Sequence, residues 1–582
     1  MKRKMILYII VGFTIISCND LDLNPLSEGS SENWYSNESE IEMAVANLFN
    51  IVYWDADLTR LSGLDPSAQN QPYQWTDKFT DDWTARATLD YITSATITSQ
   101  TSYVIGTWDY AYECIAAANR ILVNLDRAKS KVTDDKINEF AANARFVRAS
   151  QYAKLIFLYG DVPYYTNIMD VDEAFSLSRT AKETILDSIY IDYDYAIQYL
   201  PKSYANNEYK FATKGAALAM KSRIALYMKD YKIARDASEA CMNLGIYELY
   251  PDYQKLFLSS TKNSIETVFA NPRSVELGLM IHKGNRPKEP LPRNAGGFGN
   301  GGPSWDLFCS YLCTDGLPID ESPLFNPQEP FKNRDPRCAA SITEFGTEWL
   351  GYIYQPHPDS VTVLKISTGA YVQNQDTRSV QQYCSYNALV WKKKIDEDWL
   401  DLETDPDNIV IRYADVLLIY AEAKIELGEI DQSVLDAINK VRARAYKADF
   451  EETSLYPAVT TTNQSELRKI LRVERRMEFA WEGRRYADII RWKLAEKVLN
   501  LPIYGILDAA ELKEKVVDKG LWFFPETPSI DEDGVPDFSS LYNKGLVKFL
   551  VQRKFDQTKQ YLWPIPSTEI EINPNIVQNP NY

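Results

Sequence analysis

Histidine is scarce in this chain: the 582 residues include only His282 and His357. Histidine is the most frequent general base at neutral pH and the commonest metal ligand in proteins. Two isolated histidines therefore disfavour both His-based hydrolytic sites and His-containing metal centres. We expect no catalytic residue, no metal site and no cofactor.

Positive charge is also in deficit, since 63 lysines and arginines stand against 81 aspartates and glutamates, a formal net charge of −18. A balance of this sign repels the phosphate backbone of nucleic acids instead of attracting it. We therefore expect no nucleic-acid partner.

Long hydrophobic runs are missing, and the sequence predicts no transmembrane helix. The one clear apolar run, Met5 to Ile16, follows three cations and is too short to cross a bilayer, but it suits the core of a signal peptide. It ends at Ser17 and Cys18, which resembles a bacterial lipobox. We predict a lipoprotein signal peptide at residues 1–17 and a lipid anchor on Cys18; an ordinary secretory signal followed by a chance cysteine is the alternative.

Cysteine is sparse and irregularly spaced. Apart from Cys18, six remain, with no CxxC pair among them. A chain of this length buries enough core to be stable without disulfides, so buried free thiols are at least as well supported as bridges, and we assign none.

Aromatic residues are abundant, at 13% of the chain, and many lie in segments with helical periodicity. Apolar positions spaced three and four residues apart predict helices at residues 412–428 and 434–445, a similar pair within 215–244, and longer helices at 137–159 and 463–481. Residues 251–408 are rich in proline and glycine and have no sustained period. The predicted fold is mainly α: a tetratricopeptide-like scaffold of helical hairpins with long loop-rich insertions and a few short strands.

Several short motifs recur in a recognisable order along the whole chain. They lie at residues 18–22, 143–149, 158–163, 214–217, 333–337, 412–418, 474–478, 482–486, 488–492, 563–566 and 578–582. In this order the motifs resemble the SusD/RagB family, the surface glycan-binding lipoproteins of Bacteroidetes outer membranes.

The resemblance implies a SusD-like fold and a binding function without covalent chemistry. A protein of this kind is lipid-anchored in the outer membrane, exposed at the cell surface, and hands an oligosaccharide to a SusC-like TonB-dependent transporter. We expect an N-terminal region at residues 18–250 and a C-terminal region with the ligand loops at 251–582, packed as one unit. Capture of peptides or glycopeptides is the alternative, and a glycoside hydrolase is less favoured.

Some charged residues of the shared motifs have a structural and a functional interpretation. Arg475, Arg476, Glu478 and Glu482 could form an acid–base pair with cations, but ion pairs that join helices are the favoured interpretation. The acidic segment 531–537 lacks a complete calcium loop and is interpreted as a solvated turn.

Candidate ligand residues are aromatic and polar side chains in irregular segments, because a sugar presents a C–H face to a ring and hydroxyl groups to polar atoms. Two segments, 75–86 and 298–311, combine both types. The predicted ligand residues are Trp83, Phe298 and Trp305 as stacking rings, with Asp81, Arg86 and Asn300 as hydrogen-bonding groups. Trp108, in register with Tyr112 on a helix, is interpreted as ordinary packing.

Overall fold

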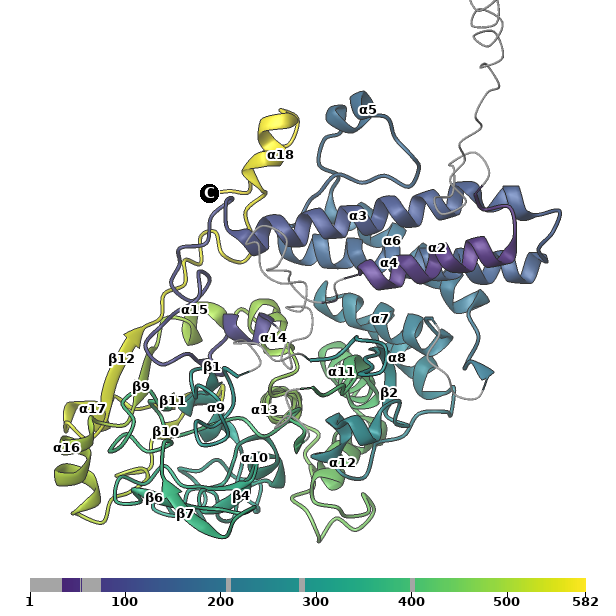
Figure 1. Cartoon of the computed structure of the whole chain (residues 1–582). Helices are drawn as coiled ribbons and strands as arrows, with labels where there is room; N and C mark the ends of the chain where they lie inside the picture. The colour runs from purple at the N-terminus through teal and green to yellow at the C-terminus, as the bar shows by residue number, and fades with distance from the viewer. Residues whose placement is uncertain (1–33, 53, 55–74, 206–210, 282–287, 398–402) are drawn as a thin grey trace, which may run out of the picture.

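The computed structural model describes residues 34–52, 54, 75–205, 211–281, 288–397 and 403–582 (Figure 1). The predicted signal peptide and Cys18 lie outside these residues. Within the described ranges, every helix is too short or too polar to traverse a bilayer.

Long helices form one side of the molecule. They are α2 (Glu38–Ile51), α3 (Ser102–Asn124), α4 (Asp134–Tyr159) and α6 (Lys182–Tyr199), and α4 packs against both α3 and α6 (Figure 1). Helix α4 ends where predicted, at Gly160, whose φ of 77° is favourable for glycine but strained for other residues.

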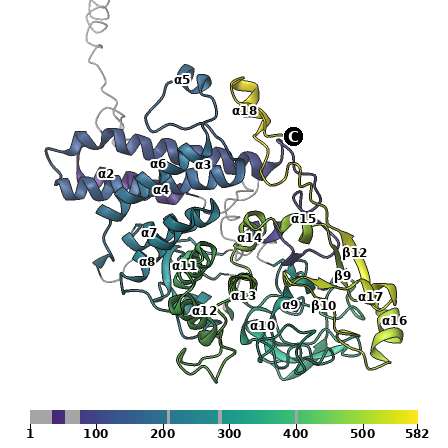
Figure 2. The same cartoon turned by 180° about the vertical axis from the view of Figure 1, so that it is seen from behind.

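Two helical hairpins follow beside this layer. The first is α7 (Lys214–Tyr227) with α8 (Tyr231–Met242), and the second is α11 (Tyr413–Leu427) with α12 (Gln432–Ala445). Helix α11 packs against α8, which places the two hairpins side by side although about 200 residues separate them (Figure 2). The predicted hairpins are confirmed, and with them the mainly helical fold class.

Helix α13 (Gln464–Glu478) ends earlier than the sequence predicts. The predicted helix extends to Trp481, but this residue has a left-handed backbone with φ 61°. The turn directs the Trp481 indole into the core, where it stacks on Trp391 with ring centroids 4.7 Å apart and planes 6° apart. Core packing of an aromatic ring therefore overrides the helical pattern here.

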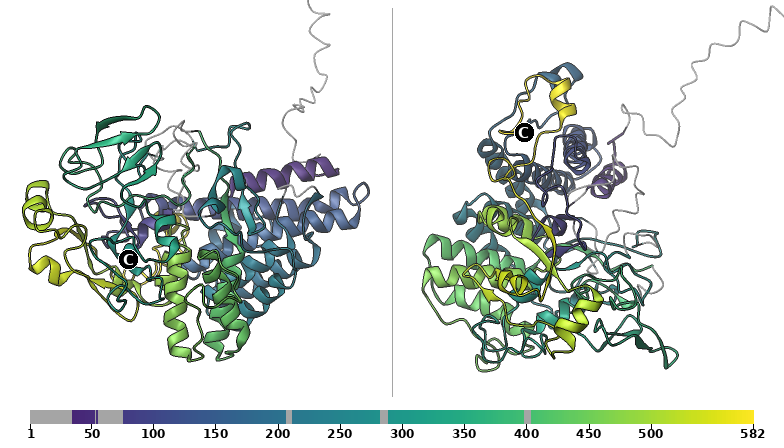
Figure 3. Two further views of the ribbon diagram at one scale, coloured as in Figure 1. Left: turned by 90° about the horizontal axis from the view of Figure 1, so that it is seen from below. Right: turned by 90° about the vertical axis from the view of Figure 1, so that its left-hand side faces the viewer.

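The remaining elements are short, and most belong to the loop-rich part of the molecule (Figure 3). They are η2 (Trp75–Phe79), β1 (Trp83–Thr84), η3 (Leu125–Ala128), α5 (Val171–Ser176), η5 (Lys255–Phe257), η6 (Ser259–Thr261), β2 (Thr267–Asn271), β3 (Gly302–Pro303), α9 (Trp305–Ser310), α10 (Pro336–Ser341), β4 (Thr347–Trp349), β5 (Tyr352–Tyr354), β6 (Thr362–Lys365), β7 (Ala370–Gln373), β8 (Asn408–Arg412), α14 (Arg485–Arg491), α15 (Ala495–Val498), β9 (Pro502–Gly505), α16 (Ala509–Leu512), η8 (Lys513–Val517), β10 (Ser529–Ile530), β11 (Pro536–Asp537), α17 (Ser539–Asn543), β12 (Lys548–Gln552) and α18 (Ser567–Ile572).

The strands form small antiparallel sheets. One sheet has four strands in the order β4-β5-β6-β7, and the others are the pairs β1-β3, β2-β8, β9-β12 and β10-β11. In the β1-β3 pair, Trp83 lies opposite Pro303 and Thr84 opposite Gly302. This short pair joins the two segments in which the sequence places the ligand residues.

A buried network of ion pairs connects α13 and the turn after it with β8 and the loop-rich part. Glu478 accepts hydrogen bonds from Arg412 at 2.6 Å and from Arg337 at 2.9 Å. Glu482 accepts from Arg412 at 2.7 Å and from Lys393 at 2.6 Å. These contacts confirm the interpretation of the motif charges as ion pairs between elements. Burial alone would raise the pKa of Glu482, but Arg412 and Lys393 lower it to about 2.

The six described cysteines are all buried free thiols. Of the two interpretations of the sequence, free thiols or disulfide bridges, the structure has the first. Burial raises the pKa of Cys114 to about 12, so this thiol stays protonated and unreactive. Among the described residues there is no group of three or more His, Cys, Asp or Glu side chains able to hold a metal ion.

Candidate functional site

Trp83 is mainly a core residue. Its side chain is buried, with 5% exposed, and its ring stacks on Trp391 with centroids 6.3 Å apart. Gly301 also lies close to the ring, since a Cβ at this position would come within 2.3 Å of Trp83 Cζ2. The ring is therefore held by its neighbours, and little of it remains for a ligand.

The edge of Trp83 forms part of a small polar pocket of about 250 Å³, which we name the β1 pocket. Asn300, Lys78, Glu289 and Asp90 also line it. Lys78 Nζ lies 2.9 Å from Glu289 Oε2 and 5.4 Å from the centroid of the Trp83 ring. The structure thus brings the predicted residues Trp83 and Asn300 to one pocket, together with several hydrogen-bonding groups.

Arg86 joins the loop after β1 to the glycine-rich loop before β3. Its backbone is left-handed, with φ 53°, a strained conformation for a side chain of this size. Its Nη2 donates a hydrogen bond of 2.7 Å to the carbonyl oxygen of Phe298 and a second one to the carbonyl oxygen of Tyr383. The predicted residues Arg86 and Phe298 are therefore in direct contact.

The same two carbonyl groups accept hydrogen bonds from a further arginine, Arg293, each at 3.3 Å. The guanidinium of Arg86 lies 5.7 Å from the centroid of the Tyr383 ring, and that of Arg378 lies 4.3 Å from the Tyr386 ring. Tyr383 is 52% exposed, so its ring is open to solvent beside these cations.

We call this surface the arginine–tyrosine platform and define it by Arg86, Arg293, Arg378, Tyr383 and Tyr386. The sequence analysis identifies only Arg86 among them. One feature of the sequence could have revealed Arg378, Tyr383 and Tyr386: two tyrosines and an arginine lie within nine residues of an irregular segment, 378–386. Such a combination of rings and charge outside regular structure is typical of a recognition loop.

Asp81 does not face this surface. It is fully buried, and its carboxylate accepts hydrogen bonds from Arg485 Nε at 2.9 Å and from Arg476 Nη2 at 2.8 Å. Burial would raise the pKa of Asp81, but Arg476 and Arg485 hold it far below its ordinary value. These contacts assign Asp81 a structural role, and we do not retain it as a ligand residue.

Trp305 also lies in the core. It is 2% exposed, its Nε1 donates a 3.0 Å hydrogen bond to the carbonyl oxygen of Asn387, and its ring contacts Phe524 with centroids 5.1 Å apart. The sequence analysis treats residue 305 as part of a loop, but Ser304 caps a short helix, α9, through a hydrogen bond from Leu307 N to its Oγ at 3.1 Å. The helix directs Trp305 inward, so no ring face is available for a ligand.

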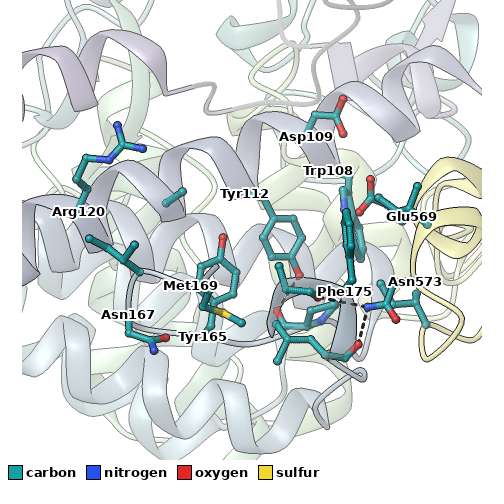
Figure 4. Close-up of a pocket in the computed structure, with 17 residues that line it drawn as sticks. Trp108, Asp109, Tyr112, Arg120, Tyr165, Asn167, Met169, Phe175, Glu569 and Asn573 are labelled. Atoms are coloured by element: carbon teal, nitrogen blue, oxygen red, sulfur yellow. Dashed lines mark hydrogen bonds between the residues drawn. The ribbon is translucent and has the colours of Figure 1, made fainter. Parts of the chain in front are cut away.

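A second and larger cavity, of about 350 Å³, lies between α3, the chain leading into α5, and α18 (Figure 4). We name it the α3–α18 cavity. Tyr112 extends from α3 and donates a 2.7 Å hydrogen bond to the carbonyl oxygen of Pro163. Trp108 is 2% exposed and packs against Tyr112 with centroids 5.0 Å apart, which confirms that it is a packing residue.

The mouth of this cavity is apolar and its inner wall carries a carboxyl group. Phe175 and Ile572, from α5 and α18, are 44% and 53% exposed. Burial raises the pKa of Glu569, and the nearby charge of Asp109 adds to the effect. The cavity therefore differs from the platform in having exposed apolar side chains and a carboxyl group.

Two family models match the chain. The one described as the SusD family matches residues 269–582, and the one described as starch-binding associating with outer membrane matches residues 35–226. Together they include every residue of the platform and the long helices α2, α3, α4 and α6.

Curated proteins and solved structures agree with these matches. SusD-like protein P2 of Formosa agariphila is 24% identical over an alignment that covers 100% of both chains. The crystal structure of a SusD-like carbohydrate-binding protein from Bacteroides fragilis has a TM-score of 0.75 and 27% identity, covering 93% of this chain and 99% of that one. A laminarin-binding SusD-like protein has a TM-score of 0.58 and 19% identity over 94% of this chain and 100% of its own, and at that identity shares the fold alone.

Proposed function

The chain belongs to the SusD family, and from this premise we propose that it captures oligosaccharides at the bacterial cell surface and delivers them to a SusC-like TonB-dependent transporter. The carbohydrate-binding protein of Bacteroides fragilis that is 27% identical supports this ligand class. The name of the second family model, which mentions the outer membrane, supports the location.

The observation that carries the proposal is the exposed ring of Tyr383 beside the guanidinium of Arg86. A pyranose needs a flat apolar face for its C–H groups and donors for its hydroxyl groups. Tyr383 offers the first and Arg86 the second, and we retain Asn300, which lines the β1 pocket, as a further hydrogen-bonding group. The ring of Phe298 is half-buried in the same loop, and we retain it as a secondary contact.

Binding at such a surface is expected to be weak. Each ring contact contributes about 0.5–1.5 kcal/mol beyond the burial of area, and association has its own cost in freedom of motion. One or two rings with a few hydrogen bonds correspond to a Kd in the micromolar to millimolar range, roughly −4 to −8 kcal/mol. Weak capture is compatible with delivery, because the ligand has to be released to the transporter.

We further propose that the protein binds its ligand without changing it. None of the five residues that define the platform carries a carboxyl group, whereas a glycoside hydrolase works through a pair of carboxyl groups. The absence of new reducing ends, after long incubation with a polysaccharide that the protein binds, tests this point. Release of reducing sugar would favour the alternative that the protein is a glycoside hydrolase.

The lipid anchor is part of the proposal as well. Acylation of Cys18 places the protein on the outer membrane, and two or three acyl chains give a stable attachment. Mass spectrometry of the mature N-terminus, with a Cys18→Ala variant as the control, tests it. An unmodified Cys18 in the wild-type protein would contradict this part.

The main experiment is affinity electrophoresis in gels that contain single polysaccharides. We expect retardation on at least one glycan, and loss of that retardation in Tyr383→Ala. Phe175→Ala, in the α3–α18 cavity, is the matched control because it also removes an exposed ring, and it should be retarded like the wild type. Normal retardation of Tyr383→Ala would place the site elsewhere.

Peptide capture is the second candidate function, and the α3–α18 cavity is the observation that favours it. Its exposed Phe175 and Ile572, at 44% and 53%, fit apolar side chains better than sugar hydroxyl groups. Binding of short apolar peptides that is lost in Phe175→Ala and kept in Tyr383→Ala, with no retardation by any glycan, would support this candidate over glycan capture.

A further inference from the structure

Three guanidinium groups are crowded together on a protein whose overall charge is strongly negative. Arg86 and Arg293 donate to the same carbonyl oxygen of Phe298, at 2.7 and 3.3 Å, so the two donor nitrogens lie within about 6 Å of each other. Arg86 and Arg378 flank the same ring, that of Tyr386, at 5.8 and 4.3 Å from its centroid. The chain as a whole has a formal charge of −18, so this gathering of cations is local.

Few carboxylates offset these cations. The groups that accept from the side chains of Arg86 and Arg293 are main-chain carbonyls, which carry no net charge. Arg378 pairs with Asp508 at 2.8 Å, but the same carboxylate also accepts from Lys548 at 2.6 Å. The platform is therefore left with an excess of positive charge.

Asp376 is a second carboxylate close to the platform in the described part of the chain. It is buried, and it accepts the main-chain N–H groups of Arg293 and Asn294 at 2.6 and 3.2 Å. Burial raises the pKa of Asp376 to about 6, so it is still mostly ionised at neutral pH and offsets one of the positive charges, which leaves the platform cationic. Burial and the charges of Arg293 and Arg378 lower the pKa of Arg86, as expected for cations held close together.

Each of the three arginines also has an unused hydrogen-bond donor. Arg86 Nε, Arg293 Nε and Arg378 Nη1 are buried and have no hydrogen-bond partner. An unsatisfied donor is a cost to the folded protein, and a guanidinium is well suited to donate two parallel hydrogen bonds to a carboxylate or a sulfate group. A ligand with such a group relieves the charge crowding, and its negative charge is also favoured by the unsatisfied N–H groups behind the surface.

We propose that the arginine–tyrosine platform selects acidic oligosaccharides, in which the sugar carries a carboxylate or a sulfate ester. The anionic group lies between Arg86 and Arg293, and the face of the sugar ring stacks on Tyr383. The inference rests on the proposed function, since it names the chemical class of glycan bound at the same site. Nucleic acid, the other common polyanion, is disfavoured by the charge of the rest of the chain.

The test is affinity electrophoresis of the mature protein in three gels that contain a neutral glucan, a polyuronate, or a sulfated galactan. We expect retardation in at least one acidic gel, reduced about tenfold in apparent affinity by Arg86→Ala and by Arg293→Ala. Retardation should weaken as salt rises, because the contact is between charges. Lys332→Ala removes one positive charge from a remote exposed position, where the side chain is 61% exposed, and should leave retardation unchanged.

The possible outcomes test selection of acidic glycans separately from glycan capture itself. Retardation by the polyuronate alone, by the sulfated galactan alone, or by both supports the inference and identifies the anionic group. Retardation by the neutral glucan alone overturns it while glycan capture stands. Failure to bind any member of a broad glycan panel overturns the function itself. If Arg86→Ala melts well below the wild type, then Arg293→Ala and the salt dependence of the wild-type protein decide.

Discussion

The guanidinium of Arg86 donates a 2.7 Å hydrogen bond to the main-chain carbonyl of Phe298, across a separation of 212 residues. The contact fastens the loop after β1 to the glycine-rich loop before β3. These two loops carry Arg86 and Phe298, while the exposed ring of Tyr383 belongs to a third segment, 378–386. Arg86 thus connects the two loops, and it is also the cation that we propose to contact the ligand.

The left-handed backbone of Arg86 predicts an order of stability among its variants. At φ 53°, glycine is relaxed and alanine is strained by about 1 kcal/mol. Both variants lose the same hydrogen bonds to carbonyl groups, so Arg86→Gly should be more stable than Arg86→Ala by about that amount. Urea denaturation measures the difference. An alanine variant equal to or more stable than the glycine variant would show that the backbone at this position is not strained.

Gly301 is predicted to tolerate no side chain. Its added Cβ would lie 2.3 Å from Cζ2 of Trp83, a ring held in place by Trp391. Gly301→Ala should therefore destabilise the protein by about 1–3 kcal/mol through overpacking. Gly245→Ala is the control, because its added methyl group meets nothing within 4 Å and only its backbone, at φ 66°, is strained. Equal losses in the two variants would contradict the packing argument.

The ion pairs of Glu482 predict a dependence of stability on pH. Arg412 and Lys393 overcome the effect of burial and lower its pKa from 4.5 to about 2. A carboxylate with a depressed pKa stabilises the fold above its unfolded pKa, and this stabilisation is lost as pH falls through the folded pKa. Stability should therefore decline between about pH 5 and pH 2, by about 3 kcal/mol from this group.

Denaturation at pH 6, 4 and 3 checks this dependence. Glu482→Gln should be less stable at pH 6, because it leaves Arg412 and Lys393 partly unpaired in the core. It should also have a shallower decline in acid than the wild type. An identical slope in the two proteins would mean that Glu482 does not titrate as described.

Reduction should leave the stability unchanged. The six described cysteines are buried and free, so no covalent link among them depends on the redox state. The thermal midpoint in dithiothreitol should equal that in buffer alone, provided that the protein has not met an oxidant while unfolded. A fall of several degrees on reduction would reveal a stabilising disulfide.

The helical part of the molecule could be predicted from the sequence because its signal is local. Helices α11 and α12 follow a regular apolar spacing, and Gly428 has the left-handed conformation, φ 74°, that ends the first of them. The charges of Glu478 and Glu482 could be assigned to ion pairs because nothing in the sequence visibly raises the pKa of either carboxyl group. Their partners could not be named, because Arg412 and Arg337 lie 66 and 141 residues from Glu478.

The candidate site could be predicted only in part, because it depends on contacts between distant segments. The mixture of rings and polar groups in their loops selects Arg86 and Phe298, which the structure brings into contact; their role in ligand binding, and that of Asn300, stays a prediction. Tyr383 is missed because it reaches the site through contacts such as that with Arg293, 90 residues away, for which no periodic signal exists. Trp305 is assigned wrongly because a short capped helix turns an apparent loop residue into the core.

The domain boundary between residues 250 and 251 stays a prediction. Hydrophobic residues from both sides of it share one cluster, in which Ile115 of the first region and Trp563 of the second are both buried. Limited proteolysis should therefore find no cleavage that yields two separately folded halves.

The most direct measurement is a crystal structure of the mature protein with the oligosaccharide that retards it most. The account predicts a sugar ring against the face of Tyr383, with polar or anionic groups in contact with Arg86 and Arg293. A ligand bound in the α3–α18 cavity, with the platform empty, would contradict it.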